Sequence, residues 1–379
     1  MKNFALETFF STWEFSAEHH MTASDAQSVT ISELLELGGE SLDNLGKVYL
    51  GYTETWGARS LRTAIAKTYE SLDAENILCF AGAEEGVYAA MRVLLSASDH
   101  AIVVVPNYQA AETLPLDICQ VSGVALDPND NWSLNLDEVE RAIQPNTKLV
   151  SVCFPNNPTG KIMPADGWAE LISLCRKHDL YLFSDEVYRL LELDPGKRID
   201  QAADVYEKGL SLNVMSKAYG LPGLRIGWIA TQDKQVLQEL EYYKHYLSIC
   251  NSAPSEWLAE VALSVSDKLL QKNRSLLSNN REKLNDFFDR YTALFEWQQP
   301  DGSCIAYPRF IGRGGVESFC QNLVEESGVL LLPASIYRSE LMSAPTDRFR
   351  ISFGRANMDA GLSAFSDYLE LHSDSLTPQ

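Results

Sequence analysis

The segment SKAYGLPGLRIGW (residues 216–228) places a lysine directly after a serine, and an arginine follows eight residues later. Glycines and a proline separate Lys217 from Arg225, so the backbone can turn and bring both side chains to one ligand. A lysine amine can form a Schiff base with an aldehyde when burial or a nearby cation lowers its pKa. The guanidinium of Arg225 is a permanent cation that matches a phosphate. The segment therefore predicts an amine nucleophile beside an anion site.

The composition indicates a globular protein with an acidic surface. The chain has 379 residues, 45% of them hydrophobic, and a net charge of −21. Such a surface repels nucleic acid and anionic lipid, so neither is an expected partner, and a cytoplasmic location is favoured. The seven cysteines are scattered without a CxxC pair, so reduced thiols are expected rather than disulfides or a metal site. No signal peptide or long apolar run predicts a membrane segment.

Short apolar runs alternate with helical patterns along most of the chain. Residues 101–105, 148–154 and 180–183 read as buried strands, whereas 84–97 and 165–178 repeat apolar residues at helical spacing. This alternation predicts an α/β fold with a mostly parallel sheet and helices on both faces. A long charged helix is expected over about 265–290, followed by an α+β pattern. We therefore predict a large domain over residues 36–275 and a small domain made of 1–35 and 276–379.

Polar side chains follow four of the predicted strands at the point where each strand ends. These side chains are Tyr108, Asn157, Asp185 with Tyr188, and Ser216 with Lys217. Ligands of open α/β sheets bind at the carboxyl ends of the strands. Each residue alone is typical of a turn or a helix N-cap. Together they predict one ligand crevice.

The remaining groups suit an aromatic, phosphorylated ligand. Asp185 can hold a protonated ring nitrogen, and Tyr108 offers a flat face on which a ring can stack. The segment FAGAEEG (80–86) opens a helix, so the backbone amides of Ala83 and Glu84 can bind an anion.

NNPTG (156–160), SDEVY (184–188) and SKAYGLPGLRIGW together resemble the pyridoxal-phosphate enzymes of fold type I, in the class I and II aminotransferase family. The resemblance extends from about Tyr52 to Arg350. It implies a large domain with a mostly parallel seven-stranded sheet in an αβα sandwich, plus a smaller α+β domain. It also implies pyridoxal 5′-phosphate as the cofactor and an expected absence of a metal.

The resemblance implies a role for each residue around the cofactor ring. Lys217 would hold the cofactor aldehyde and later move a proton. Asp185 would keep the pyridinium nitrogen protonated. Asn157 and Tyr188 would hydrogen-bond the ring hydroxyl, and Tyr108 would stack on the ring.

The resemblance also implies where the phosphate and the substrate bind. Arg225, Ser216 and the amides of Ala83 and Glu84 would hold the phosphate. Further residues complete the expected site: Tyr52 would reach the phosphate of a neighbouring subunit, which implies a homodimer with shared sites, and Arg350, beside Asn157, would bind the substrate α-carboxylate.

Three positions depart from the family pattern. Val214 stands where a serine commonly touches the phosphate, and Ala334 stands where glycine is common. Glu84 stands where a small polar residue is usual. Because a carboxylate repels a phosphate, we expect the Glu84 side chain to point away from it, towards the helix-terminal amides or solvent.

The expected function is that of an aminotransferase acting on an amino acid and a 2-keto acid. A lyase or cyclase similar to capreomycidine synthase is the alternative, because both reactions begin with loss of the Cα proton. A non-catalytic effector domain of a transcription regulator is disfavoured by the acidic charge and by the presence of Lys217. No second arginine stands out for a dicarboxylic substrate, and the negative field favours a cationic amino acid.

Overall fold

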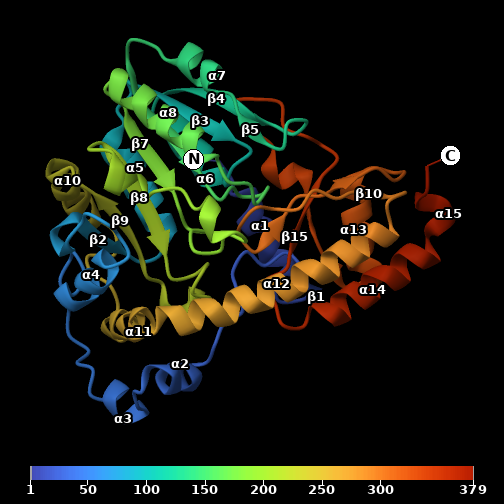
Figure 1. The fold of residues 1–379 in the computed structure, drawn as a ribbon, viewed down its shortest axis with the longest axis horizontal. Coiled ribbons are helices and arrows are strands. Elements are labelled where there is room, and N and C mark those ends of the chain that lie inside the picture. The colour runs from blue at the N-terminus through green and yellow to red at the C-terminus, as the bar shows by residue number, and fades with distance from the viewer. Residues whose placement is uncertain (1, 379) are drawn as a thin grey trace.

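A computed structural model describes residues 2–378. Its main sheet has eight strands in the order β2-β9-β8-β7-β6-β3-β4-β5 (Figure 1). The strands are β2 (Ile77–Phe80), β3 (His100–Val105), β4 (Gln120–Asp127), β5 (Ser133–Leu134), β6 (Thr147–Cys153), β7 (Tyr181–Asp185), β8 (Gly209–Val214) and β9 (Gly227–Thr231). The five strands from β8 to β4 run parallel, and β9 pairs antiparallel with both β2 and β8. The mostly parallel architecture is confirmed, but the sheet has eight strands rather than seven because the two-residue β5 pairs with the end of β4.

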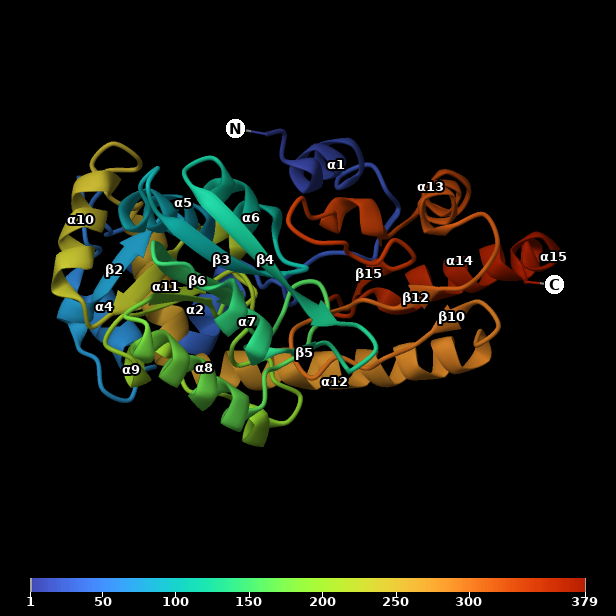
Figure 2. The same ribbon diagram turned by 90° about the horizontal axis from the view of Figure 1, so that it is seen from above.

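Helices cover both faces of this sheet (Figure 2). They are α4 (Arg59–Ala66), α5 (Ala83–Leu94), α6 (Gln109–Leu116), α7 (Leu136–Ala142), α8 (Ala165–Lys177), α9 (Ala202–Val205), α10 (Lys234–Lys244) and α11 (Ala253–Ser264). Successive strand residues point to opposite faces. Leu149 and Phe183 accordingly pack in a cluster with α5, whereas Val150 and Leu182 pack with Trp168 of α8 in a second cluster. The sheet therefore lies between two apolar cores, as the fully buried strands predicted.

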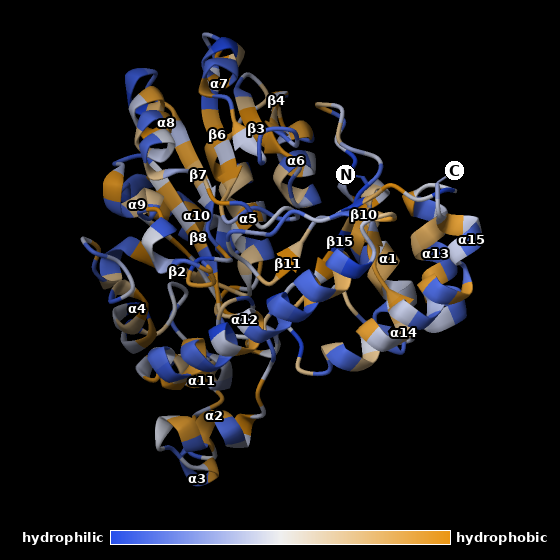
Figure 3. Cartoon of the chain, turned by 45° about the vertical axis from the view of Figure 1, so that its right-hand side comes forward, coloured by the Kyte–Doolittle hydropathy of each residue, from blue (hydrophilic) through white to orange (hydrophobic). Residues whose placement is uncertain are grey.

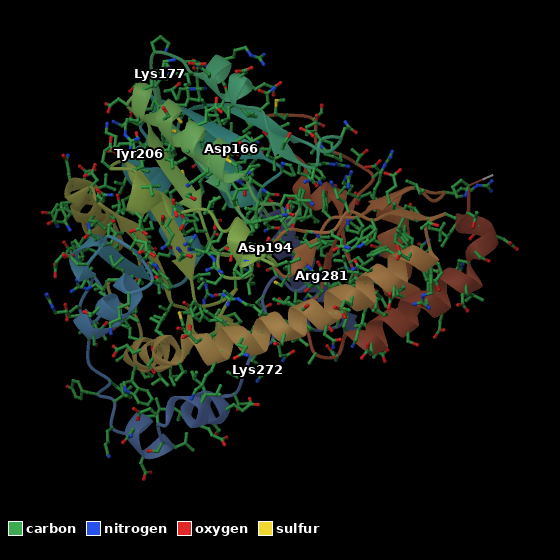
Figure 4. All side chains as sticks on the ribbon, viewed as in Figure 1. Asp166, Lys177, Asp194, Tyr206, Lys272 and Arg281 are labelled. Carbon is green, nitrogen blue, oxygen red and sulfur yellow. The ribbon has the colours of Figure 1, made fainter. Side chains whose placement is uncertain are left out.

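A long helix, α12 (Ser266–Arg290), leads from this sheet to the C-terminal elements, and its solvent face carries charged side chains such as Lys272 (Figure 4). Beyond it lie three helices, α13 (Val316–Ser327), α14 (Met358–Leu371) and α15 (Ser373–Leu376), and the short strands β10 (Phe295–Glu296), β11 (Ile305–Ala306), β12 (Arg309–Phe310), β13 (Val329–Leu330), β14 (Leu332–Pro333) and β15 (Phe349–Ser352). Aromatic rings form their core; Phe288 stacks on Trp297 at 4.6 Å and Phe310 on Phe319 at 4.2 Å. The predicted division at residue 275 falls inside the unbroken α12 and stays a proposal.

The N-terminal segment extends along both the part that contains the main sheet and the C-terminal part that follows α12. It contains α1 (Ala5–Trp13), β1 (His19–His20), α2 (Ile31–Gly38) and α3 (Leu42–Leu45). β1 pairs in parallel with β13, so the chain start is joined to the C-terminal elements. Colouring by hydropathy shows apolar residues on the central strands and a mixed, amphipathic pattern on the outer helices (Figure 3).

The described residues contain neither membrane-spanning helices nor a metal cluster. Between residues 2 and 378, no helix is long and apolar enough to cross a bilayer, and no group of three or more His, Cys, Asp or Glu side chains could hold a metal ion. All seven cysteines are free.

Candidate active site

A cavity of about 610 Å³ lies at the carboxyl ends of the parallel strands. The predicted site residues that line it are Ala83, Glu84, Tyr108, Asn157, Asp185, Tyr188, Ser216, Lys217, Arg225 and Arg350. Tyr52 is the one predicted residue outside it. The cavity therefore gathers side chains from strands far apart in the sequence, as the strand-end pattern predicted.

Lys217 is positioned by the loop that follows β8. The Met215 amide donates to the Ile226 carbonyl at 2.9 Å, which folds the loop back on itself. The Lys217 Nζ atom donates to Ser24 Oγ at 2.7 Å and lies 5.8 Å from the centre of the Tyr188 ring. Burial lowers the pKa of Lys217, because a desolvated amine is less easily charged. A lowered pKa favours the neutral, nucleophilic amine.

Asp185 ends β7 as a carboxylate with no cationic partner. Its Oδ1 atom accepts a hydrogen bond from the Val187 amide at 3.1 Å. Burial raises the pKa of Asp185 to about 6, while the Val187 amide and the charge of Lys217 oppose the rise. No Lys, Arg or His of residues 2–378 lies within ion-pair distance of it. A buried carboxylate is costly without a cation, so this position suits a ligand that carries one.

Tyr188 and Asn157 lie beside this carboxylate. The Tyr188 side chain is 1% exposed, and its hydroxyl has no hydrogen-bond partner in the structure. Buried hydroxyls are normally satisfied, so this one indicates a missing ligand atom. The Asn157 Oδ1 atom accepts from the Tyr337 hydroxyl at 2.9 Å and from Arg350 Nη1 at 3.4 Å.

Arg350 is fully buried on β15, and no carboxylate of residues 2–378 lies within ion-pair distance of it. Its Nη1 atom donates to the Tyr337 hydroxyl at 2.7 Å, and its Nη2 atom donates to the Thr22 carbonyl at 2.7 Å. These neutral acceptors fix the guanidinium in place and leave its charge uncompensated. The arrangement suits a carboxylate of a ligand. Sequence reasoning found Arg350 but missed Thr22 and Tyr337, which are its supports.

The start of α5 and the loop after β8 form the anion end of the cavity. The helix begins at Ala83 after Gly82, whose φ of 92° favours glycine. A Cβ atom at Gly82 would collide with the Arg225 guanidinium, and one at Gly227 would lie 2.8 Å from the Ala83 nitrogen. The Gly82 backbone, the Arg225 guanidinium and the amides at the start of α5 therefore lie together, and the buried Ser216 lines the same cavity.

Two of the three positions that depart from the family pattern, Val214 and Glu84, lie at this cavity. Val214 is buried, lines the cavity and offers no hydrogen bond. Glu84 lines the cavity and its side chain is exposed to solvent, so its expected direction away from the phosphate stays a prediction. Burial, with the negative charges of Glu7 and Asp185, raises its pKa to about 7.

The N-terminal segment lines part of the cavity. Phe4, Leu6, Glu7, Phe10 and Glu14 of α1 and its flanks line it. In Figure 2 this helix lies at the surface, apart from the main sheet.

The segment after α1 adds further missed residues to the cavity. Ser24 and Asp25 belong to the lining. Asp25 forms an ion pair with Arg355 at 2.9 Å. No motif singles them out in the sequence, in which they follow the aromatic run FFSTWEF (residues 9–15).

Tyr52 lies on the loop between α3 and α4, outside the cavity of its own chain. Its side chain is 91% exposed, and the neighbouring Tyr49 and Leu50 are also exposed. Three adjacent exposed apolar side chains are unusual on a solvated loop.

The family model for aminotransferase class I and II matches residues 24–364. The chain belongs to this family. Capreomycidine synthase from Streptomyces vinaceus is 27% identical over 374 residues, which cover 97% of this chain and 94% of that protein. A PLP-dependent aminotransferase from Streptococcus suis superposes with a TM-score of 0.91 at 27% identity, over 98% of each chain. The PLP-dependent cyclase OrfR superposes with a TM-score of 0.89 at 24% identity, also over 98% of each chain, and shows the shared fold.

This protein is accordingly a pyridoxal-phosphate-dependent enzyme of fold type I, and pyridoxal 5′-phosphate is its cofactor. The cavity fits that cofactor. The unpartnered Tyr188 hydroxyl matches the ring hydroxyl, and the Asp185 carboxylate, which has no cation beside it, matches the ring nitrogen. The space at Gly82 that a Cβ atom would fill matches the phosphate.

Proposed function

We propose that this enzyme is an aminotransferase, which exchanges the amino group of an amino acid for the carbonyl oxygen of a 2-keto acid. The observation that carries the proposal is the convergence of the Lys217 amine, the Asp185 carboxylate and the Arg350 guanidinium on one cavity. None of the three has an ion-pair partner among residues 2–378. Each therefore offers a charge or a nucleophile that the cofactor or an amino acid would complement.

The ring end of the cofactor would be held by four side chains. Asp185 would face the protonated ring nitrogen, and this cation would keep the carboxylate ionised despite its burial. Tyr188 would donate its free hydroxyl to the ring oxygen beside Asn157. Tyr108 would stack on the ring face.

The phosphate end would be held at the start of α5. The amides of Ala83 and Glu84, the Ser216 hydroxyl and the Arg225 guanidinium would bind the phosphate. Val214 contributes no donor, so the phosphate would depend on these groups and on Tyr52 of a second copy.

When bound, the cofactor supplies an electron-accepting ring that stabilises negative charge at the substrate Cα. Lys217 would remove the Cα proton and later return it, because its lowered pKa makes the neutral amine available as a base. Ser24 would orient the amine through its 2.7 Å hydrogen bond. Arg350 would hold the α-carboxylate and so fix the Cα–H bond toward Lys217.

A lyase or cyclase is the second candidate. The similarity to capreomycidine synthase over 97% of this chain favours it. The same proton removal by Lys217 would then be followed by loss of a leaving group from Cβ and, in a cyclase, by addition of a nucleophile from the substrate itself.

A donor screen separates the two reactions. Purified holoenzyme would be mixed with single amino acids, with and without a 2-keto acid, while the cofactor absorbance and the products are measured. Turnover that depends on the 2-keto acid supports the aminotransferase. Ammonia or a cyclised product formed without an acceptor supports the second candidate, and an unchanged spectrum with every donor contradicts both.

We further propose a cytoplasmic homodimer with shared sites. The exposed Tyr52 would complete the phosphate site of its partner. Mixed dimers of Lys217→Ala and Tyr52→Ala chains would test this, because one of their two sites carries both substitutions and the other carries none. Activity recovered on mixing the two inactive variants supports sharing, and an active monomer in sedimentation contradicts it.

A further inference from the structure

Three carboxylates of the cavity have no assigned partner. Five carboxylates line it, and Asp25 is paired with Arg355, whereas Asp185 is assigned to the cofactor ring. Glu7, Glu14 and Glu84 remain. Within residues 2–378, no lysine, arginine or histidine lies within 4.0 Å of any of the three. The Tyr108 hydroxyl, 3.4 Å from Glu7 Oε1, is a neutral contact.

These carboxylates are close enough to influence one another. Burial and then the charges of Glu7 and Asp25 raise the pKa of Glu14, while Arg355 lowers it. Burial and then Glu7 and Asp185 raise the pKa of Glu84, while Tyr108 and Arg225 lower it. Like charges that share a site without a counter-ion repel, so a bound cation would relieve this repulsion.

Independent features of the same cavity indicate that its ligand includes an amino acid. Among the described residues, the fully buried Arg350 guanidinium contacts no carboxylate, and the buried Tyr188 hydroxyl has no hydrogen-bond partner. Once Arg350 binds the α-carboxylate of the substrate, the substrate side chain is the part that can contact the three glutamates.

We propose that Glu7, Glu14 and Glu84 form the side-chain subsite and that the substrate is an amino acid with a cationic side chain, a guanidinium or an ammonium group. The inference rests on the proposed function, because it takes Arg350 as the carboxylate site. An acidic side chain would be repelled by the subsite. A neutral one would leave the glutamates uncompensated.

The subsite joins α1 to α5. Glu7 and Glu14 belong to α1 and its C-terminal end, whereas Glu84 belongs to α5. α1 is attached through the Ala5 amide, which donates to Gln109 Oε1 at 2.8 Å, and through Gln109 Nε2, which donates to the Asn3 carbonyl at 2.8 Å. A cation bound between the glutamates would therefore hold α1 against the body of the enzyme.

L-Arginine and L-citrulline provide the test, because they differ mainly in a guanidinium replaced by a neutral urea group. Calorimetry with holoenzyme is expected to show arginine binding about tenfold or more tightly, since hydrogen bonds between charged groups are the stronger ones. Glu7→Gln, Glu14→Gln and Glu84→Gln should each weaken arginine binding several-fold and leave citrulline binding unchanged. Glu170→Gln, which removes a charge from the exposed face of α8, should change neither.

A second readout does not depend on turnover. Phe15 is 96% exposed just after α1, so chymotrypsin should cleave there, and arginine should slow this cleavage more than citrulline does. Cofactor content and melting temperature would confirm that each variant is folded.

Equal binding of arginine and citrulline, or undiminished arginine binding in all three glutamine variants, would overturn the subsite. Tight, glutamate-dependent arginine binding without release of a keto acid would support the subsite and contradict the aminotransferase instead.

Discussion

The strand ends and the N-terminal segment line one cavity, and they differ in how they are held. Lys217 and Asp185 follow central strands whose residues are buried between two apolar cores. α1 has a single buried residue, Leu6, and its segment is attached by hydrogen bonds to Gln109, by an ion pair between Lys2 and Glu340, and by ring contacts of Phe4 with Tyr108 and of Phe10 with His20.

This difference indicates that the two regions have separate functions. The rigid strand ends fix the groups that need accurate geometry for proton transfer. α1 and its C-terminal end provide two of the three carboxylates that we assign to the substrate side chain, Glu7 and Glu14. Closure over a bound ligand is the usual reason to place such groups on a separate element. The predictions below test this division, from the largest expected effect to the smallest.

Lys217→Ala should lower turnover by about 10²–10⁴-fold or more, because it removes both the attachment point of the cofactor and the proposed base. The measurement is the initial rate with the best amino donor. Lys272→Ala, on the exposed face of α12, is the matched control and should keep full activity. A Lys217→Ala enzyme with normal turnover would contradict the assignment.

Leu212→Ala should lower the free energy of unfolding by about 2–5 kcal/mol, because Leu212 is fully buried in β8 and its truncation leaves a cavity. Leu6→Ala in α1 should cost less, because a loosely attached helix can adjust or detach without global unfolding. Denaturant melts monitored by circular dichroism would compare the two. Equal losses would show that α1 is part of the cooperative core.

Arg350→Gln should raise the KM for the amino acid by about 10–100-fold, because a charged hydrogen bond to the α-carboxylate is lost. The effect on kcat should be smaller if Arg350 mainly binds the substrate. Steady-state kinetics at saturating 2-keto acid would separate the two constants. A loss confined to kcat would contradict a role in binding.

Arginine binding should strengthen a few-fold between pH 6 and pH 8. The pKa of Glu84 is raised to about 7, so this carboxylate is mostly protonated at pH 6 and mostly ionised at pH 8, where it can pair with a cation. Glu7 from α1, Asp185 from β7, Tyr108 and Arg225 face it. Calorimetry at several pH values would measure how the arginine affinity changes with pH. Glu84→Gln should reduce this change, and an unchanged pH dependence of the affinity in that variant would assign the titration to another group.

The sequence by itself determined the sheet and the groups at its strand ends. Buried strands with residues such as Lys217 or Asp185 directly after them predict one crevice, because parallel strands end at the same edge. The motifs around these residues also identified the family and the cofactor. These features are local in the chain, so their spacing is enough to place them.

Only the tertiary structure decided what surrounds those groups. Thr22 supports Arg350 across 328 residues of sequence, and Ser24 binds Lys217 across 193. The place of α1 beside the cavity likewise depends on packing between distant segments. No periodicity or motif encodes such contacts, because each exists only once the chain has folded and the two partners lie side by side.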